Sequence, residues 1–309
     1  MKVLVTGASG FLGQYALAAL QQAGIAAVAL ARTRPRDLAG AQFVPGDLLE
    51  HADLGKLVQR AEASHLLHLA WVTDHGAYWS SPLNFRCVDA TTRLVEAFCQ
   101  AGGKHAVLAG TCAEYDWGHG RCEEDSTPLN PATVYGVAKD ATRRLVAALC
   151  VQHQVRCAWA RIFFPYGAGE SPSRLVPVLV EVLRGQRAPF GISAAVYRDF
   201  LHARDVAQGL LTLLQTDARG SYNISSGQPV QLASLVHTLA QLMQTDARPL
   251  LDLPPQRLAE PALVAGENLK LKALGWQQQF TLQQGLAQML SDLPVVRSGQ
   301  RSGVAVDGP

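Results

Sequence analysis

The chain opens with a strand-like run, a glycine-bearing turn, a helical stretch and a second strand-like run. The first run is Lys2–Thr6, the helical period covers about Phe11–Gln22, and the second apolar run lies near 25–30. Short apolar runs that alternate with longer helical stretches are typical of stacked βαβ units. Such units build a parallel sheet with helices on its faces. The sequence therefore predicts an α/β fold with a doubly wound parallel sheet.

Further strands are expected at 65–69, 106–109 and 157–162. After Pro165 the alternation of strands and helices becomes irregular and Pro and Gly are more frequent, which predicts a second, smaller mixed α/β lobe. We expect the sheet domain at 1–165, joined by part of 198–216, and the smaller lobe mainly at 166–295. The Ser- and Gly-rich residues 296–309 have the composition of a flexible tail.

Composition and charge exclude several classes of protein. The chain has 309 residues, of which 48% are hydrophobic and 17% charged, enough for a large core and a second lobe. Its formal net charge of +2 is not concentrated in any Lys- and Arg-rich run, so nucleic acid is not expected as a partner. A strand begins at Val3, and Gln21, Gln22 and Gly24 interrupt the early apolar segment. We therefore expect no signal peptide and no membrane span, and a cytoplasmic location.

The cysteines predict neither a metal site nor a disulfide framework. None of them forms a Cys-x-x-Cys pair, and none has a histidine at the spacing of a zinc site. Unpaired cysteines fit a reducing compartment. The six are Cys87, Cys99, Cys112, Cys122, Cys150 and Cys157.

The turn after the first strand has the residues of a phosphate-binding loop. It reads Thr6-Gly7-Ala8-Ser9-Gly10-Phe11-Leu12-Gly13. Glycines permit a tight turn and close approach of the backbone to a pyrophosphate, whose charge is favoured at a helix N-terminus. The spacing is Gly-x-x-Gly-x-x-Gly, which differs from the common Gly-x-Gly-x-x-Gly dinucleotide motif. A turn chosen only for packing is the alternative interpretation.

Tyr135 and Lys139 form a second motif, Tyr-x-x-x-Lys, in a segment whose apolar spacing continues helically through Leu145 and Leu149. Residues at i and i+4 lie on one helix face, so the ammonium can sit beside the phenol. A neighbouring cation favours the phenolate and lowers the tyrosine pKa from about 10, toward the range of proton exchange at neutral pH. The alternative is a surface pair that shares a face without a chemical role.

A third motif stands at the expected end of a strand, where ligand sites of open α/β sheets gather. It is the hydroxyl residue Thr111, followed by Cys112-Ala113-Glu114-Tyr115. The glycine loop, this threonine and the Tyr-x-x-x-Lys helix, in that order, resemble the short-chain dehydrogenase/reductase superfamily. Five further segments resemble its extended, nucleotide-sugar-modifying branch, the NAD-dependent epimerase/dehydratase proteins: Gly46-Asp47-Leu48, His68-Leu69-Ala70, 161–167, 198–202 and 222–227.

The resemblance implies a Rossmann-like fold and a catalytic set of three residues. Tyr135 would be the general acid/base, Thr111 would hold the substrate oxygen by a hydrogen bond, and Lys139 would bind the nicotinamide ribose and tune Tyr135. Asp47 would bond the adenine amino group, and the segment from Phe163 to Pro165 would border the nicotinamide. The full set of implied cofactor-binding residues is Gly7, Gly10, Phe11, Leu12, Gly13, Arg32, Asp47, Leu48, Ala70, Lys139, Phe163 and Pro165.

The resemblance also implies substrate-binding residues, Arg174 and Arg198. Arg198 would contact the substrate diphosphate, a role that suits a permanently charged, forked donor. Structural alternatives exist for several residues. Arg198 could pair with Asp199, Asp47 could cap a helix that begins near Leu48, and His68 is expected to be a core histidine.

Two departures from relatives restrict the reaction. The family's 4,6-dehydratases follow the catalytic threonine with an Asp-Glu pair, whereas Cys112 and Ala113 stand here, so dehydration is disfavoured. The epimerase-reductases that make GDP-fucose carry a cysteine and a histidine where this chain has Ala113 and Arg174, so epimerisation by that pair is disfavoured too. We interpret Cys112 as a packing residue. A keto-sugar reductase, a nucleotide-sugar 4-epimerase and a non-catalytic dinucleotide-binding sensor or scaffold remain open, as does a flavonoid, steroid or thioester substrate.

The end of the second strand bears on the choice of cofactor. NAD-selective enzymes of this fold place an acid there to bond the ribose 2′-hydroxyl. This chain reads Ala31-Arg32-Thr33-Arg34 instead, and an arginine at that point can pair with a 2′-phosphate. The sequence therefore predicts NADP(H) over NAD(H), and with it a reductase; solvated loop charges are the alternative. The resemblance further implies a homodimer that pairs the helix from about Val88 to Gln100, and the Tyr135 helix, with their copies.

Overall fold

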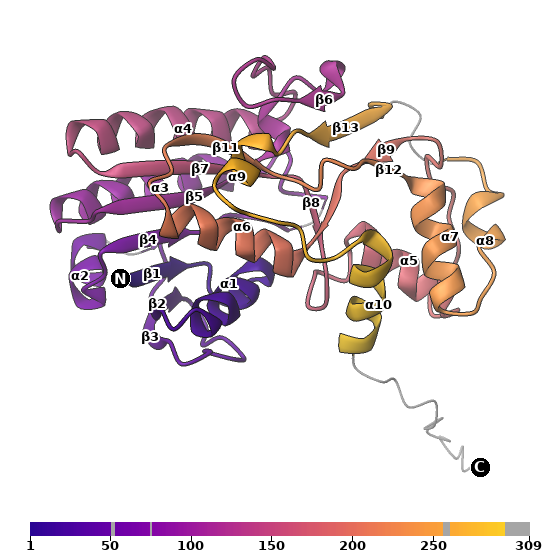
Figure 1. Cartoon of the computed structure of the whole chain (residues 1–309), viewed down its shortest axis with the longest axis horizontal. Helices are drawn as coiled ribbons and strands as arrows, with labels where there is room; N and C mark the ends of the chain where they lie inside the picture. Colours follow the sequence, from indigo (N-terminus) through magenta and orange to yellow (C-terminus); the bar gives the residue numbers. More distant parts are fainter. Residues whose placement is uncertain (51–52, 75, 256–259, 294–309) are drawn as a thin grey trace, which may run out of the picture.

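A seven-stranded parallel sheet runs through the larger part of the molecule (Figure 1). The computed structural model describes residues 1–50, 53–74, 76–255 and 260–293, so the expected tail at 296–309 lies outside the described residues. The strand order is β11-β7-β5-β4-β1-β2-β3, and every neighbouring pair is parallel. The strands are β1 (Lys2–Thr6), β2 (Ala26–Ala31), β3 (Gln42–Pro45), β4 (His65–His68), β5 (His105–Thr111), β7 (Arg156–Ile162) and β11 (Gly220–Ile224). The order reverses between β1 and β4, which confirms the doubly wound sheet.

Helices cover both faces of this sheet. One face carries α1 (Phe11–Gln22) and α6 (Ala203–Gln215), and the other carries α2 (Leu54–Ala61), α3 (Leu83–Gln100) and α4 (Val134–Gln152). The period of two along β1 explains this arrangement, because Val3 and Val5 pack with α1 and α6 while Leu4 packs with α2 and α3. Burial on both faces is why the strands read as continuous apolar runs.

The expected elements of the first unit are confirmed, and others extend further than expected. β5 continues two residues beyond the expected 106–109 and ends at Thr111, and α3 begins at Leu83 and not near Val88. His68 is a core histidine as expected. Its ring nitrogens bond the hydroxyls of Thr6 (2.8 Å) and Thr91 (2.9 Å), and burial lowers its pKa to about 3.

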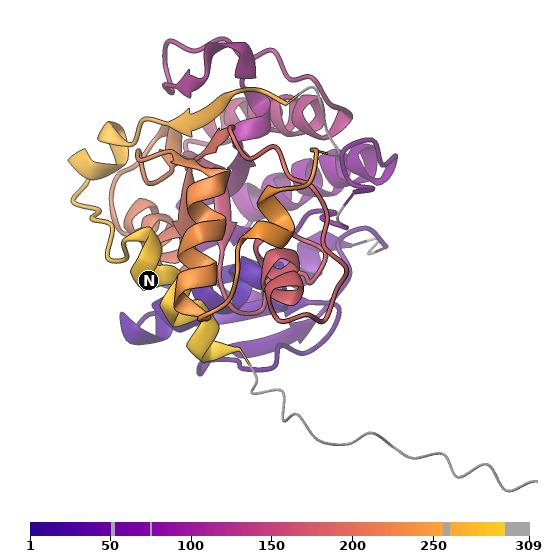
Figure 2. The same ribbon diagram turned by 90° about the vertical axis from the view of Figure 1, so that its right-hand side faces the viewer.

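The smaller lobe contains both helices and strands. Its core is built from α5 (Leu175–Leu183), α7 (Leu232–Leu242), α8 (Arg248–Leu251) and α10 (Leu282–Asp292). Its strands are β8 (Phe164–Tyr166) with β10 (Phe200–His202), and a mixed sheet of β12 (Val230–Gln231), β9 (Tyr197–Arg198), β13 (Leu263–Gly266) and β6 (Arg121–Cys122), with α9 (Leu269–Ala273) following β13. Figure 2 shows α5, α7 and α10 in front of the large sheet.

The chain crosses between the two parts more than once. After β10 it returns to the large sheet as α6 and β11 before it re-enters the lobe at β12. We therefore propose the division 1–165 and 166–295 with 203–224 assigned to the sheet domain, a longer return than the expected part of 198–216. The short strand β6 is the exception, since it lies within 1–165 but pairs in the sheet of the lobe. The two parts meet along the carboxyl edge of the large sheet (Figures 1 and 2).

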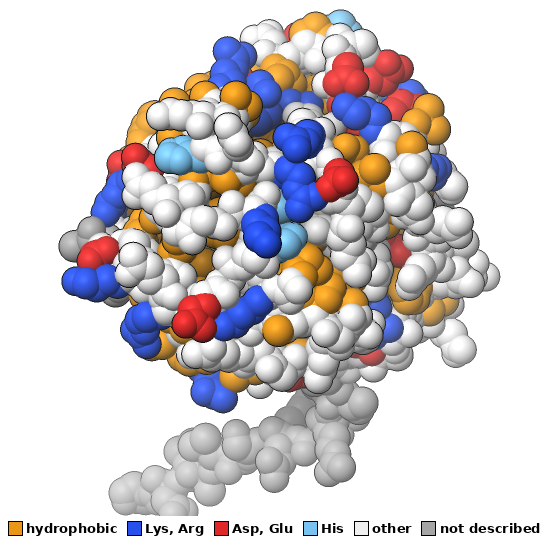
Figure 3. All heavy atoms as spheres, turned by 60° about the vertical axis from the view of Figure 1, so that its left-hand side comes forward, with side chains coloured by type: hydrophobic (Ala, Val, Ile, Leu, Met, Phe, Trp, Pro, Cys, Tyr) orange, Lys and Arg blue, Asp and Glu red, His pale blue; other side chains and the backbone are white. Residues whose placement is uncertain are grey.

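Within the described residues we find no disulfide, no candidate metal cluster and no membrane-spanning helix. All six cysteines are free, and the described part of the chain contains no cluster of three or more His, Cys, Asp or Glu suited to a metal ion. Among the described helices none is both long and apolar enough to span a membrane. On the face shown in Figure 3, Lys and Arg side chains lie among neutral and hydrophobic ones.

Candidate active site

Three parallel strands bring the sequence motifs to one edge of the sheet. Thr6 at the end of β1 pairs with His68 of β4, and His68 pairs with Leu108 of β5. β5 continues three residues further, to Thr111, where it pairs with Ile162 of β7. The glycine loop, the segment after β4 and Thr111 therefore lie at the carboxyl edge, beside the order reversal where ligands of such sheets bind.

The glycine loop is tight because neighbouring backbone leaves no room for side chains. Gly7 has a φ of +68°, and a Cβ there would lie 2.7 Å from the backbone nitrogen of Ala70. A Cβ on Gly13 would lie 2.2 Å from the carbonyl oxygen of Gly7. Gly10 is the N-cap of α1 and has no side chain to occupy the free amides that follow. A loop of bare backbone at a helix N-terminus fits a pyrophosphate.

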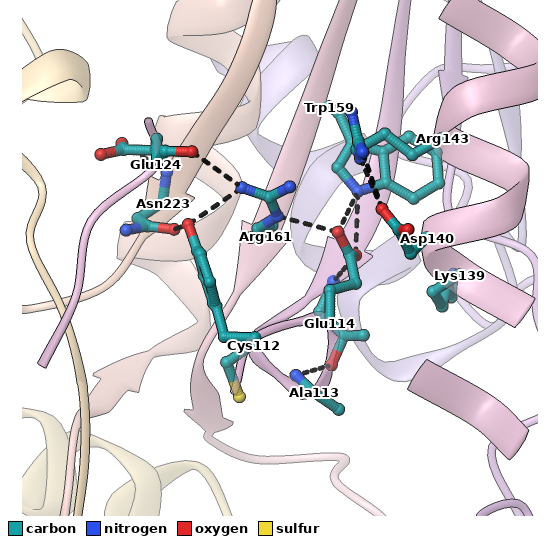
Figure 4. Close-up of polar contacts among 12 residues, drawn as sticks. Cys112, Ala113, Glu114, Glu124, Lys139, Asp140, Arg143, Trp159, Arg161 and Asn223 are labelled. Atoms are coloured by element: carbon teal, nitrogen blue, oxygen red, sulfur yellow. Dashed lines mark hydrogen bonds and ion pairs between the residues drawn. The ribbon is translucent and has the colours of Figure 1, made fainter. Parts of the chain in front are cut away.

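Thr111 is held by a short 3₁₀ helix, Cys112–Glu114, that follows β5. The Thr111 hydroxyl accepts from the backbone N–H of Ala113 (3.2 Å), and the Glu114 carboxylate accepts from the backbone N–H of Thr111 (2.8 Å). This reciprocal pair is a capping box. Figure 4 shows the Glu114 side chain pointing from this turn toward Trp159 and Arg161.

Helix α4 carries Tyr135 and Lys139 to the same place. Its N-cap Thr133 accepts from the N–H of Gly136 (3.1 Å), and Gly136 permits close packing, because a Cβ there would lie 2.3 Å from the carbonyl oxygen of Ala113. The Thr111 side chain lies close enough to the Tyr135 phenol to influence its pKa. The Lys139 Nζ lies 6.0 Å from the centre of the Tyr135 ring and donates to the carbonyl of Ala109 (2.8 Å). The three predicted catalytic residues are thus brought together.

The electrostatics of this set differ from the sequence expectation. Burial raises the pKa of Tyr135, and the neighbouring Thr111 side chain opposes that shift only partly. Burial also lowers the pKa of Lys139 to about 7. The prediction of a lowered Tyr135 pKa is therefore wrong, because desolvation is the largest effect on the phenol.

Sequence analysis missed an aromatic wall around Tyr135. The Tyr78 and Trp79 rings lie 4.9 and 5.7 Å from the Tyr135 ring, both edge to face, and the Trp79 carbonyl accepts from the Tyr135 N–H (3.1 Å). The Lys139 Nζ lies 3.8 Å from the centre of the Trp71 ring, a close cation–π contact. The aromatic residues between β4 and α3 were the available signal for this wall.

Arg174 is close to the catalytic set, whereas Arg198 has other partners. The Arg174 guanidinium lies 4.9 Å from the Tyr78 ring and donates to its hydroxyl (3.3 Å). Arg198 pairs with Glu260 (3.3 Å) and donates to two backbone carbonyls. The alternative in which Arg198 pairs with Asp199 is wrong, because Asp199 accepts from the backbone N–H groups of 226, 227 and 266.

The residues assigned to the adenine side lie at the ends of β2 and β3. Arg32 directly follows β2 and is exposed. Asp47 follows β3, and its carboxylate accepts from the N–H of Leu49 (2.9 Å). The alternative in which Asp47 caps a helix near Leu48 is wrong, because residues 48–50 form a turn and α2 begins at Leu54.

The residues assigned to the nicotinamide side contribute mainly backbone. The Phe163 side chain is buried against Tyr115 and Val264, so only its backbone can line a cleft. Pro165 lies in β8 and is partly exposed. Cys112 is a packing residue as interpreted, since it is buried in the same cluster and burial raises the pKa of its thiol.

Comparison with known proteins identifies the family. Residues 3–225, most of the chain, match the model of the NAD dependent epimerase/dehydratase family. The chain belongs to this family. It is an enzyme of the extended short-chain dehydrogenase/reductase type.

Its relatives differ in the reaction that they catalyse. UDP-glucose 4-epimerase of Streptomyces lividans is 26% identical over 89% of this chain and 91% of that protein. GDP-6-deoxy-D-mannose reductase of Pseudomonas aeruginosa is 28% identical over 94% of this chain and 96% of that protein. The solved structure of MoeE5 with UDP-glucuronic acid and NAD is 30% identical, with a TM-score of 0.84 over 94% of this chain and 98% of that chain.

The crowding around Gly7 makes a testable prediction. Gly7→Ala should weaken the binding of a nicotinamide dinucleotide at least about tenfold, because the new Cβ must push Ala70 or the loop aside. Gly24→Ala is the matched control, with a similar φ of +67° but open space around the Cβ. It should lower the melting temperature and leave the affinity unchanged. A folded Gly7→Ala protein with wild-type affinity in a fluorescence titration would contradict this account of the loop.

Proposed function

We propose that the protein transfers a hydride between a nicotinamide cofactor and the sugar of a nucleotide-sugar, as an NADPH-dependent keto-sugar reductase. The observation that carries the proposal is that the Tyr135 phenol lies beside Thr111, with Lys139 on the same helix face, next to the glycine loop. A bound nicotinamide would supply the hydride. The nucleotide-sugar is proposed because relatives along the whole chain act on such substrates or bind them.

The protonation of Tyr135 favours reduction over oxidation. Because burial raises the pKa of Tyr135, the phenol is protonated at neutral pH. A protonated phenol is ready to donate to the carbonyl oxygen of a keto-sugar as hydride reaches its carbon. The Thr111 hydroxyl then orients that oxygen, and the Lys139 ammonium, on the same helix face as Tyr135, binds the nicotinamide ribose. Arg174, one aromatic ring away from Tyr135, and Arg198 are the proposed contacts to the nucleotide-sugar.

The preference for NADPH rests on the loop after β2. Arg32 follows the strand directly, is exposed and can meet a 2′-phosphate. The Arg34 guanidinium lies over the Phe43 ring. Asp37, the acid of this loop, uses a carboxylate oxygen to accept from the N–H of Ala39 (2.8 Å). This arrangement suits a phosphate better than a free ribose hydroxyl.

A 4-epimerase that retains NAD is the second candidate. It is favoured by relatives, since UDP-glucose 4-epimerases match nearly the whole chain and MoeE5 was solved with NAD. It requires Tyr135 to be present as the phenolate in the first half-reaction, and the raised pKa of Tyr135 lowers the fraction of phenolate at neutral pH. A non-catalytic sensor is less well supported because Thr111, Tyr135 and Lys139 are all in place.

Removal of the phenol tests the catalytic assignment. Tyr135→Phe should lower turnover about a hundred- to ten-thousand-fold, the range for a general acid, and leave the dinucleotide affinity within about twofold of wild type, since the aromatic ring remains. The measurement is NADPH oxidation with a nucleotide-linked keto-sugar. Wild-type turnover in the variant would rule out Tyr135 as the proton donor.

Titration of both reduced cofactors tests the NADPH preference. Wild type should bind NADPH more tightly than NADH, and Arg32→Ala should weaken NADPH about ten- to a hundredfold, since a charge-assisted hydrogen bond contributes about 1.5–3 kcal/mol. Arg36→Ala, an exposed arginine of the same loop, is the control and should preserve the preference. Equal affinities in wild type, or an unchanged ratio in Arg32→Ala, would favour the NAD-dependent epimerase.

We also propose a homodimer through α3 and α4. The two helices pack side by side on one face of the sheet, and both expose large apolar side chains: Phe85 on α3, and Val137, Leu145 and Val151 on α4. Large apolar side chains on adjacent helices are typical of protein interfaces. A second copy of the same surface would bury them about a twofold axis.

Sedimentation at micromolar concentration tests this assembly. Wild type should sediment with twice the mass of the chain, and Leu145→Glu should shift it to the monomer by placing a charge in the buried interface. Leu269→Glu, on an exposed apolar residue of α9, should remain dimeric. A monomeric wild type would show that the exposed side chains serve another purpose.

A further inference from the structure

The buried Glu114 carboxylate accepts a hydrogen bond from the backbone of the catalytic threonine, Thr111. The Glu114 side chain has no exposed surface, and three donors converge on it (Figure 4). Arg161 Nε of β7 donates to Oε2 (2.8 Å), and Trp159 Nε1 of the same strand lies 2.9 and 3.0 Å from the two oxygens. The third donor is the Thr111 backbone N–H, at 2.8 Å from Oε1. One carboxylate thus ties β7 to the end of β5.

Arg161, which binds Glu114, is itself held by a chain of hydrogen bonds that reaches β11. Arg161 Nη1 donates to the Tyr115 hydroxyl (3.0 Å), which donates to Asn223 Oδ1 on β11 (2.8 Å). The Asn223 amide in turn donates to the carbonyls of Cys122 and Glu267. Through Arg161 and Tyr115 the carboxylate is therefore linked to β11 as well as to β5 and β7.

Stability alone does not account for this ion pair. Glu114 and Arg161 are both fully buried, and removal of two charges from water costs as much as their attraction returns, so an apolar pair of similar size is often as stable. The specific consequence lies at Thr111. Glu114 fixes the Thr111 backbone, and the Thr111 side chain lies beside the Tyr135 phenol.

The charge of Glu114 also acts on both titrating groups of the site. It raises the pKa of Tyr135 and opposes the fall in the pKa of Lys139. Both effects hold the two groups in their protonated forms. The other groups that act on Tyr135 are Thr111, Tyr78 and Cys112; Cys87 acts on Lys139, and His68 lies near it.

We propose that Glu114 is a positioning residue, which sets the orientation of Thr111 and places a buried negative charge next to the catalytic set. This inference rests on the proposed function, because it assigns Glu114 a role through those three residues. Arg161 and Trp159 act one step further away by holding the Glu114 carboxylate.

The test is the pH profile of turnover in Glu114→Gln. This change keeps an oxygen for the Thr111 N–H but removes the negative charge, so the pKa values of Tyr135 and Lys139 should fall. The loss of reductase activity at alkaline pH should then begin at lower pH than in wild type. The value of kcat should drop about ten- to a hundredfold, as for a small misplacement of catalytic groups, with dinucleotide affinity unchanged. Asp205→Asn is the matched control, a fully buried carboxylate of α6 that accepts two backbone N–H groups far from Thr111.

Glu114→Gln leaves the buried Arg161 charge without its partner. If that variant does not fold, a second variant tests the inference. Glu114→Gln combined with Arg161→Met removes both charges and should fold while showing the same shift of the alkaline limb. The inference is overturned if either folded variant has the wild-type kcat and pH profile, or shifts no more than Asp205→Asn. Failure of the proposed function is distinguishable, since wild type would then show no NADPH-dependent reduction of a nucleotide-linked keto-sugar.

Discussion

The register of three parallel strands is the constraint on which the site depends. β1 and β4 end in one row, at Thr6 and His68, while β5 continues three residues beyond that row to Thr111. This extension places a hydroxyl at the mouth of the crevice where the strand order reverses. The glycine loop follows β1 in the same crevice, so a dinucleotide held by α1 would have its reactive end near Thr111. A shift of β5 by one residue would turn Thr111 to the opposite face.

Desolvation governs the chemistry that this geometry permits. The Lys139 Nζ lies over the Trp71 ring, on the same helix face as Tyr135. Burial raises the pKa of Tyr135 and lowers the pKa of Lys139, so it favours the neutral form of each group. A neutral phenol is a proton donor, so the same burial that disfavours oxidation favours reduction of a carbonyl. The buried charge of Glu114 adds to the effect of burial on the pKa of Tyr135 and opposes the effect of burial on the pKa of Lys139.

The sequence predicted the parts of the site that are local in the chain. The glycine turn follows from spacing, and Tyr135 and Lys139 from helical geometry. Long-range partners were not predictable: Glu260 binds Arg198 across 62 residues, and Arg161 meets Glu114 across 47. The sign of the Tyr135 shift also required the structure, because it depends on burial by Tyr78 and Trp79, which come from another segment. Asp47 was mistaken for a possible helix cap because a polar residue before a turn and one before a helix look alike in sequence.

The most direct test of the account is the transfer of label from the cofactor to the sugar. The wild-type enzyme is incubated with NADPH that carries deuterium at the transferable position of the nicotinamide, together with a nucleotide-linked keto-sugar, and the product is analysed by mass spectrometry and NMR. The account predicts one deuterium per product molecule, on the carbon that bore the carbonyl oxygen. Product that forms without deuterium at that carbon would contradict it.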